Sequence, residues 1–533
     1  MNERAPRRGG GAALIAAGIL LSRVFGLVRN RLLGHYLGAG DAMDALTAAF
    51  RFPNFLQNLF GEGVLSASFI PVYARLLAEG DEVEAGRVAG AIGALLALTS
   101  TVLVLLGIVL APVIVPLVVA PGFLAEKRDL TVLLVQITFP GVGLLVLSAW
   151  TLGILNSHRR FFLSYASPVA MNIVIIGVLL WRGSTSVGEM ADQASMAAWV
   201  AWASVVGSVA QVMVQLPTVL RVERRMRVRF AVSNPHVLTV LRNFLPVFIG
   251  RGVVQLSALA DGVIASLLPG GAVAILGYAQ VITVLPVSLF GMSVSAAELP
   301  AMSSELGSEE AVAAALRRRL HDGLHRIAFY VVPSAVAFLV LGDIVGGLLY
   351  QTGRLGRTEM VWLWSVLAGS AVGLLAGTLG RLYASTFYAL RDTRTPFLFA
   401  TLRVTLTIVL GVVASLWVPG WIGIAPKWGV AGLTVSAGIA AWLEFFLLRR
   451  ALARRIGDAG VGGRYVGRLW LCAAVSALPA LGAKLVLGTG VPVVLGCVAL
   501  PLYGFAYFTI TSLLGVEEAQ AMMGRLRRLV ARG

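Results

Sequence analysis

Charge is scarce in this chain of 533 residues, in which 13% of the side chains are charged and 58% are hydrophobic. A soluble protein of this length would expose far more charge, so the composition excludes an ordinary soluble domain. Cysteine is almost absent as well, and Cys472 and Cys497 both lie in apolar runs, which favours small core residues over a disulfide or a metal pair. Period-two alternation of polar and apolar residues is lacking, which argues against a transmembrane barrel.

What the chain has instead is long apolar runs, and its mean hydropathy is +0.85. Runs long enough to cross a bilayer as a helix recur from end to end, and we count about fourteen of them. The sequence therefore predicts an all-α polytopic membrane protein. The basic N-terminus resembles a signal peptide, but no small-residue cleavage site follows, so we expect a retained first helix. Three of the expected spans, 11–34, 43–77 and 238–268, contain charged residues well inside the apolar run.

The net charge is +17, and nearly all of the basic residues are arginine. They cluster between apolar runs, as in HRR (158–160), RVERRMRVR (221–229) and RRALARR (449–455), whereas the alternate loops hold few charges. Because cytoplasmic loops of membrane proteins are rich in Lys and Arg, both termini are expected in the cytoplasm, with an even number of spans. The exceptions are Lys127, Arg128, Arg354 and Arg357. No nucleic-acid-binding motif accompanies the charge, so nucleic acid is not an expected partner.

A weak internal repeat divides the chain. NLFGEGVLSASFIP (58–71) is similar to SLFGMSVSAAELP (288–300), and RRFFLSYASP (159–168) and RDTRTP (391–396) each join a fourth span to a fifth. Chance similarity between apolar segments is the alternative. The repeat predicts two six-helix lobes in pseudo-twofold arrangement, residues 1–230 and 231–456, followed by two further helices and a basic tail over 457–533. Parallel repeats of this kind place a substrate cavity between the lobes.

The first expected span holds three arginines. Arg23 lies roughly 18 Å into it, close to mid-bilayer. Ser22 and Arg29 share one helical face with Gly26, and Arg23 and Asn30 share an adjacent one. Intramembrane arginines normally face a wet cavity or pair with an acid.

The second expected span adds Asp44, Arg51 and Glu62, which is too much polarity for contact with lipid. A wet, mostly cationic chamber explains this pattern, and such a chamber suits an anionic headgroup because guanidinium groups bind phosphate with paired donors. A structural ion-pair network, such as Arg51 with Glu62 or Asp44, is the alternative.

A resemblance emerges from these residues. The stretch SRVFGLVRNRLLGHYLGAGDAMDALTAAFRFPNFLQNLFGEGVLSASFIPVYARL (22–76), together with YQTGR (350–354) and FYALRDTRTP (387–396), resembles the MurJ (MviN) family of lipid II flippases in the MOP exporter superfamily. The resemblance implies fourteen spans and no enzymatic activity. It implies alternating access that carries undecaprenyl-pyrophosphate-linked disaccharide-pentapeptide across the bacterial cytoplasmic membrane for cell-wall synthesis. Lipid II, membrane lipids and cell-wall synthesis proteins are the expected partners. No metal or cofactor is expected, and membrane potential or a monovalent cation is a candidate for coupling.

The resemblance also assigns residues. Arg23, Arg29, Asp44 and Glu62 match charged positions of the family, and Arg51 and Arg381 match basic ones. With their neighbours they make up the expected headgroup cavity: Ser22, Arg23, Arg29, Asn30, Asp44, Arg51, Glu62 and Arg381, with Arg251, Asp261 and Gln280 as second-lobe candidates. Residues 466–515 would form a groove for the lipid tail.

The sequence departs from the family at four positions, namely Asn30, Gln57, Gln280 and Val281, so the headgroup contacts and any ion coupling stay open. Three alternatives stay open too. One is another exporter of the same fold, for O-antigen, exopolysaccharide or drugs. A second is a polytopic glycosyltransferase, which would need carboxylates or a metal on an outer loop. The third is a scaffold that keeps the fold without transport.

Overall fold

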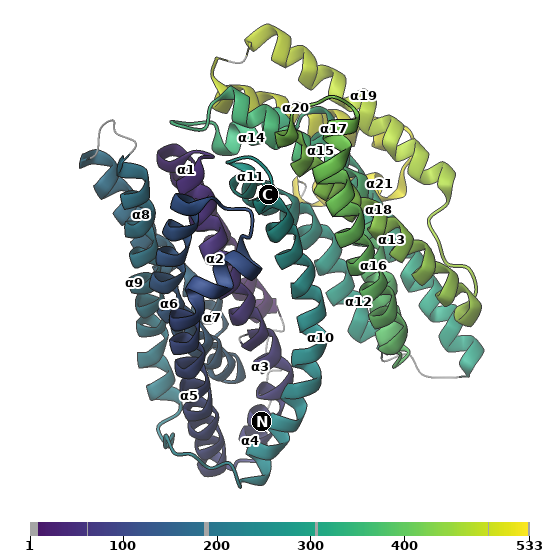
Figure 1. Ribbon diagram of the computed structural model, residues 1–533. Helices are drawn as coiled ribbons and strands as arrows, with labels where there is room; N and C mark the ends of the chain where they lie inside the picture. Colours follow the sequence, from purple (N-terminus) through teal and green to yellow (C-terminus); the bar gives the residue numbers. More distant parts are fainter. Residues whose placement is uncertain (1–8, 61, 186–190, 304–307, 489, 531–533) are drawn as a thin grey trace. The chain divides into compact units, whose positions relative to one another are not determined.

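The computed structural model describes residues 9–60, 62–185, 191–303, 308–488 and 490–530, and over these residues the chain is almost entirely helical (Figure 1). Among these described residues, the β-type pairing is limited to one isolated bridge between Thr352 and Leu355. The predicted all-α fold is confirmed. The chain divides into two compact units, Met1–Val273 and Ala274–Gly533.

The first unit holds ten α-helices and one π-helical segment within its described residues. They are α1 (Gly9–Leu37), α2 (Asp41–Phe60), α3 (Glu62–Ser68), α4 (Ile70–Ala78), α5 (Glu82–Ile114), η1 (Val115–Val119), α6 (Ala125–Ser157), α7 (Phe161–Ala166), α8 (Pro168–Thr185), α9 (Ala191–Val222) and α10 (Pro235–Ser266).

Local sequence sets several of these boundaries. Gly38, with φ of +66°, follows the last residue of α1 in a left-handed conformation that glycine adopts without strain. Asp81 caps α5 by accepting a hydrogen bond from the Glu84 N–H at 3.0 Å. Asn234 caps α10 in the same way, accepting from the backbone N–H groups of residues 236 and 237 at 2.8 and 3.3 Å. These caps satisfy donors that have no partner within the helix.

In the first unit α6 packs against α5, α9 and α2, and α8 packs against α9 (Figure 1). The interface of α6 with α9 is partly polar, because Gln215 is fully buried and its amide oxygen accepts from Ser148 Oγ at 3.2 Å. A second buried polar cluster lies where α4, α6 and α9 meet. The Tyr73 hydroxyl donates to Glu223 Oε2 at 2.6 Å and lies 2.9 Å from His158 Nε2. Since that hydroxyl has one proton, His158 is the donor in the second contact.

The second unit begins within α11 and ends in a C-terminal helix. Its elements are α11 (Ala272–Pro286), η2 (Val287–Met292), α12 (Ser293–Ser303), α13 (Glu309–Val340), α14 (Gly342–Tyr350), α15 (Arg357–Ala389), α16 (Arg394–Val412), η3 (Val413–Trp417), α17 (Val418–Trp421), η4 (Pro426–Trp428), α18 (Gly429–Ile456), α19 (Gly463–Leu487), α20 (Pro492–Leu513) and α21 (Glu517–Val530). The π-helical segment η2 follows Pro286 directly, consistent with the missing N–H of proline disturbing the regular ladder.

In the second unit α15 packs against α18 and α13, and α18 against α16. The contact of α15 with α18 is close because glycine faces glycine: a Cβ on Gly373 would lie 2.3 Å from the Cα of Gly438. The last two expected spans, α19 and α20, pack on each other and against α13 and α14. Tyr507 of α20 fixes this arrangement by donating to the carbonyl of Phe329 at 2.8 Å.

Two chain reversals, one in each unit, have the same backbone geometry. After α6, the N–H of Arg159 bonds the carbonyl of residue 156 and the N–H of Arg160 bonds that of residue 155. After α15, Arg391 and Asp392 bond the carbonyls of residues 388 and 387 in the same pattern. Arg159 and Arg391 have φ of 59° and 60° and are the non-glycine residues with positive φ in the described chain. These are the junctions that the sequence repeat aligned, and both end a helix with a Schellman motif.

Eleven helices among the described residues are long and apolar enough to cross a membrane. The expected spans 11–34, 43–77 and 238–268 coincide with α1, with α2 to α4 and with α10, which are not among the eleven and which hold most of the candidate site residues. The helix α10 belongs to the first unit, where it packs against α2 and α3. The expected boundary at 230/231 assigned it to the second lobe, and that division into lobes stays a prediction.

Candidate functional site

The polar residues of the first unit lie on α1, α2 and α10. Of these helices, α10 contacts α2 directly, and α1 packs mainly against α7 and α8. The packed face of α1 is marked by Gly18, where a Cβ would lie 3.0 Å from the Tyr165 Cβ. By contrast, a Cβ on Gly26 would meet no described atom within 4 Å, so no neighbouring helix packs closely on Gly26 within the described part of the chain.

On α1, Arg23 is exposed, whereas Ser22, Arg29 and Asn30 are half-buried. The Arg29 guanidinium donates to the Asn30 amide oxygen from Nε at 3.3 Å and from Nη2 at 3.2 Å. Asn30 is one of the four positions at which the sequence departs from the family that it resembles, and the resemblance implies an acid there. Its amide therefore still provides an oxygen acceptor for arginine, without the negative charge.

On α2, Asp44 is buried with 1% of its surface exposed, and it is fully engaged. Its Oδ2 lies 2.5 Å from Lys127 Nζ, at the start of α6, and accepts the Gly271 N–H at 2.7 Å. Lys127 also lies 2.9 Å from Asp41 Oδ1 and 4.2 Å from the centre of the Phe123 ring. This arrangement ties the connection between α10 and α11 to the start of α2.

Lys127 is the residue that the sequence interpretation missed. The charge pattern of the loops leaves it as an exception, although it is one of only three lysines in the sequence, with Lys427 and Lys484, and none of the three lies in an arginine-rich loop. The sequence suggested Arg51 as the ion-pair partner of Asp44, whereas the ion pair found in the structure is with Lys127.

Two turns along the same face of α2 lies Arg51. Both terminal nitrogens of its guanidinium are buried, and neither has a hydrogen-bond partner within the described part of the chain. The hydroxyl of Thr47, one turn earlier, is buried and unpartnered there as well. Asp261 of α10 and Asp44 act on the Arg51 charge electrostatically. Because buried donors normally find a partner, these groups call for an acceptor such as water or an anion.

The neighbour that admits Arg51 is Gly262 on α10. A Cβ at this position would lie 1.9 Å from Arg51 Nη1, so a larger residue here would force the guanidinium to move. Asp261 precedes it in the same turn. The side chains of Glu62 and Arg251, both predicted site residues, lie outside the described part of the structure.

The second unit holds two of the candidates, Gln280 and Arg381. Arg381 is exposed on α15, and Gln280 is half-buried on α11. Arg403 pairs with Glu444 at 3.0 Å, joining α16 to α18. The unit therefore uses this intramembrane cation structurally. Glu298 has Arg319 and Arg326 as neighbours at 3.6 and 3.9 Å.

The fold is that of a polytopic helical membrane protein, and transporters of the MOP superfamily have a similar fold. An inward-facing multidrug resistance MATE family transporter of that superfamily aligns with a TM-score of 0.63 and 16% identity, over 83% of this chain and 98% of its own. A lipid II flippase MurJ in an inward closed conformation aligns with a TM-score of 0.75 and 22% identity, over 94% and 98%. At these identities the likeness establishes the fold alone.

Sequence similarity is more specific. The family of lipid II flippase MurJ matches residues 33–499. A probable lipid II flippase MurJ of Rhizobium tropici is 29% identical over 96% of both chains. The lipid II flippase MurJ of Burkholderia cenocepacia is 30% identical over 82% of both. The chain belongs to the lipid II flippase MurJ family, and it is an integral membrane transporter rather than an enzyme. The resemblance stated from residues 22–76 is thereby confirmed.

Proposed function

We propose that the chain carries lipid II across the cytoplasmic membrane by alternating access, and that the pocket around Arg51 receives the pyrophosphate. The observation that carries this proposal is the pair of buried guanidinium nitrogens without a hydrogen-bond partner. A pyrophosphate offers several anionic oxygens, and a guanidinium fork can bind two of them at once. Arg23 and Arg29 on α1 are proposed to attract the headgroup first, since Arg23 is exposed.

Burial of the Arg51 donors has a consequence for the cycle. A headgroup cannot reach atoms that are closed to solvent, so the pocket must open before it binds. Lipid II then supplies acceptors for these donors through charge-assisted hydrogen bonds, which favours the state that holds the substrate. A cationic site of this kind could couple its movement to membrane potential, at about 2.3 kcal/mol per charge for each 100 mV crossed.

Orientation and partners complete the proposal. The arginine-rich ends of the helices and both termini lie in the cytoplasm, by the distribution of Lys and Arg in the loops. Single cysteines placed near either end and probed with an impermeant reagent on intact cells test this, because cytoplasmic ends stay unlabelled. Cell-wall synthesis proteins that make or consume lipid II are proposed as further partners.

The direct test is complementation in cells depleted of their own lipid II flippase, with labelled lipid II assayed on the outer leaflet. The wild-type chain should restore growth and outer-leaflet lipid II. Arg51→Ala should fail at a normal protein level, and Arg51→Lys should be strongly impaired because a lysine lacks the planar fork. Arg318→Ala, which removes an exposed arginine of α13, serves as the control. Full transport by Arg51→Ala would remove Arg51 from the headgroup site.

A further inference from the structure

The two chain reversals that share a Schellman motif differ in charge. In the second unit, Asp392 follows the left-handed Arg391, and its Oδ2 lies 2.6 Å from Nη2 of Arg455. Arg455 is the penultimate residue of α18. Asp392 also accepts the backbone N–H groups of Arg394 and Thr395, both at 3.0 Å. One carboxylate thus fastens this reversal to the end of the last helix of the repeat.

In the first unit the corresponding position after the left-handed Arg159 is Arg160, and the penultimate residue of α9 is Arg221. An acid–base pair in one repeat is therefore replaced by two cations in the other. All three arginines are exposed. Within the described residues, none of the three guanidinium groups takes part in an ion pair or a hydrogen bond. Glu223, two residues after Arg221, is buried and accepts from Tyr73, so an anion from outside the chain would stabilise these exposed like charges.

A cavity of about 450 Å³ opens at these arginines. Its lining combines Arg159, Arg160 and Arg221 with the Thr218 hydroxyl and, for the rest, with apolar side chains, and it includes no acidic residue among those described. Phe162 and Leu14 contribute large exposed hydrophobic surface, at 43% and 48% of their area. The cavity therefore has positive charge at one end and an apolar wall beside it, and this combination suits an amphiphilic molecule with an anionic head.

We propose that this cavity binds the phosphate of an anionic phospholipid at the end of the first unit where the basic loops gather. The phosphate would lie between Arg160 and Arg221, as the Asp392 carboxylate lies beside Arg455, and an acyl chain would follow Phe162. Arginine forks suit phosphate oxygens, and clustered basic residues at a membrane surface favour anionic lipids. The apolar lining favours a lipid over a free anion. The site is formed by the loop between α6 and α7 with α1 and α9, apart from the Arg51 pocket on α2 and α10.

The test is binding of phosphatidylglycerol to the purified full-length chain in detergent, followed by native mass spectrometry. Arg160→Asp is the decisive variant, because it places a carboxylate opposite Arg221, as Asp392 is placed opposite Arg455. Asp is also a favoured residue at a helix N-cap, the position that Arg160 occupies before α7, so the variant should fold. The expected result is a loss of phosphatidylglycerol affinity of about tenfold or more. Arg318→Asp makes the same charge change on α13 and should bind as the wild type does.

Two further measurements decide the outcome. Arg221→Gln should weaken phosphatidylglycerol binding several-fold, and it tests the site if Arg160→Asp folds poorly. Phosphatidylcholine should not compete, and millimolar inorganic phosphate should displace little lipid. The proposal is overturned if Arg318→Asp loses as much affinity as Arg160→Asp, or if Arg160→Asp and Arg221→Gln both bind normally. It is overturned in its lipid part if free phosphate competes fully.

Discussion

Replacing Lys127 by Met tests how the start of α2 is held. The change removes the cation 2.5 Å from Asp44 and leaves a carboxylate with 1% exposure. Breaking a buried ion pair from one side costs about 3–5 kcal/mol, because the remaining charge is buried without compensation. Asp44 keeps the hydrogen bond from the Gly271 N–H, so we expect the lower end, about 3 kcal/mol.

The assay is thermal unfolding of the purified chain in detergent, followed by tryptophan fluorescence. A loss of about 3 kcal/mol should lower Tm by roughly 5 °C or more. Lys427→Met is a matched control, because the side chain of Lys427 lies over the Trp428 ring, 5.3 Å from its centre, and the loss of that contact should cost under about 1 kcal/mol.

A double variant separates the ion pair from mere packing. Asp44→Asn combined with Lys127→Met removes both charges while an amide oxygen can still accept from Gly271. It should recover part of the stability that Lys127→Met loses. If Lys127→Met unfolds at the same temperature as Lys427→Met, or the double variant is no better than Lys127→Met, then Asp44 is not held by Lys127 in the way described.

Three further results are expected. Gly262→Ala should abolish outer-leaflet lipid II in the complementation assay at normal protein level, because its Cβ would lie 1.9 Å from Arg51 Nη1 and displace the guanidinium. Tyr73→Phe should lower the free energy of unfolding by about 1–3 kcal/mol, since Glu223 stays buried without its donor. Hydrogen bonds from the backbone N–H and the hydroxyl of the residue at 395, together with nearby cations, hold the pKa of Asp392 below its usual 3.8. The stability that Asp392 provides should therefore be complete above pH 4 and fade as the pH falls below it, so Asp392→Asn and wild type should converge in Tm in acid.

Each of these has a control or a contrary result. Gly252→Ala lies on the same helix, its Cβ would meet its nearest described neighbour at 3.9 Å, and it should transport normally. Equal transport by the Gly252 and Gly262 variants would contradict the steric argument. A Tyr73→Phe variant as stable as wild type would mean that Glu223 needs no donor. If the difference in Tm between wild type and Asp392→Asn instead grows as the pH falls, the ionised form of Asp392 does not stabilise the fold.

The sequence predicted what depends on local pattern. Apolar runs predicted the helical membrane fold, and the charges of residues 22–62 indicated the polar helices, because both properties follow from hydrophobicity and helical period. It did not predict which partner each charge takes. Asp44 meets Lys127 and Gly271, which lie far away in sequence, so only the packing of α2, α6 and α10 brings them together. Periodicity also gives no sign that Gly262 makes room for Arg51, because that contact joins two helices.

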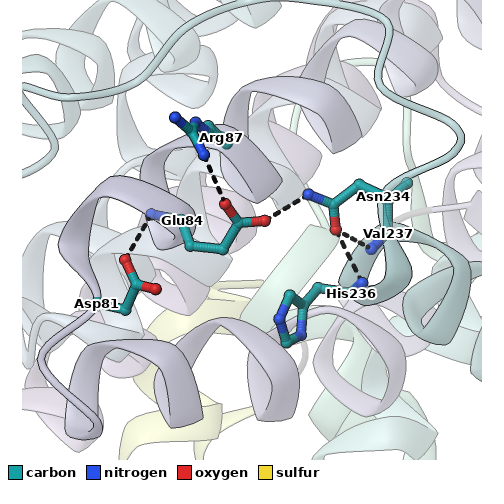
Figure 2. A network of polar contacts seen from close by, with 6 residues as sticks. All are labelled: Asp81, Glu84, Arg87, Asn234, His236 and Val237. Carbon is teal, nitrogen blue, oxygen red and sulfur yellow. Dashed lines mark hydrogen bonds and ion pairs between the residues drawn. The ribbon is translucent and has the colours of Figure 1, made fainter.

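The attachments of α10 bear on where the chain can bend. At its start, Asn234 bonds Glu84, which is itself held by Arg87 at 3.2 Å, so the network joins α10 to α5 (Figure 2). At its far end, the Ser266 hydroxyl accepts the Gly122 N–H at 3.3 Å. Gly271, just beyond, is bound by Asp44 as described above.

A helix fastened at both ends moves as part of the body to which it is fastened. The long basic segment before α10 looks like a linker, but it cannot serve as a hinge while these bonds hold. The first pivot available to the chain lies after Gly271, at the start of α11. The helix α10, which the predicted repeat assigns to the second lobe, would thus move together with the helices of the first unit. The predicted boundary between the two repeats, at 230/231, would then differ from the boundary of the first compact unit, which lies after α10.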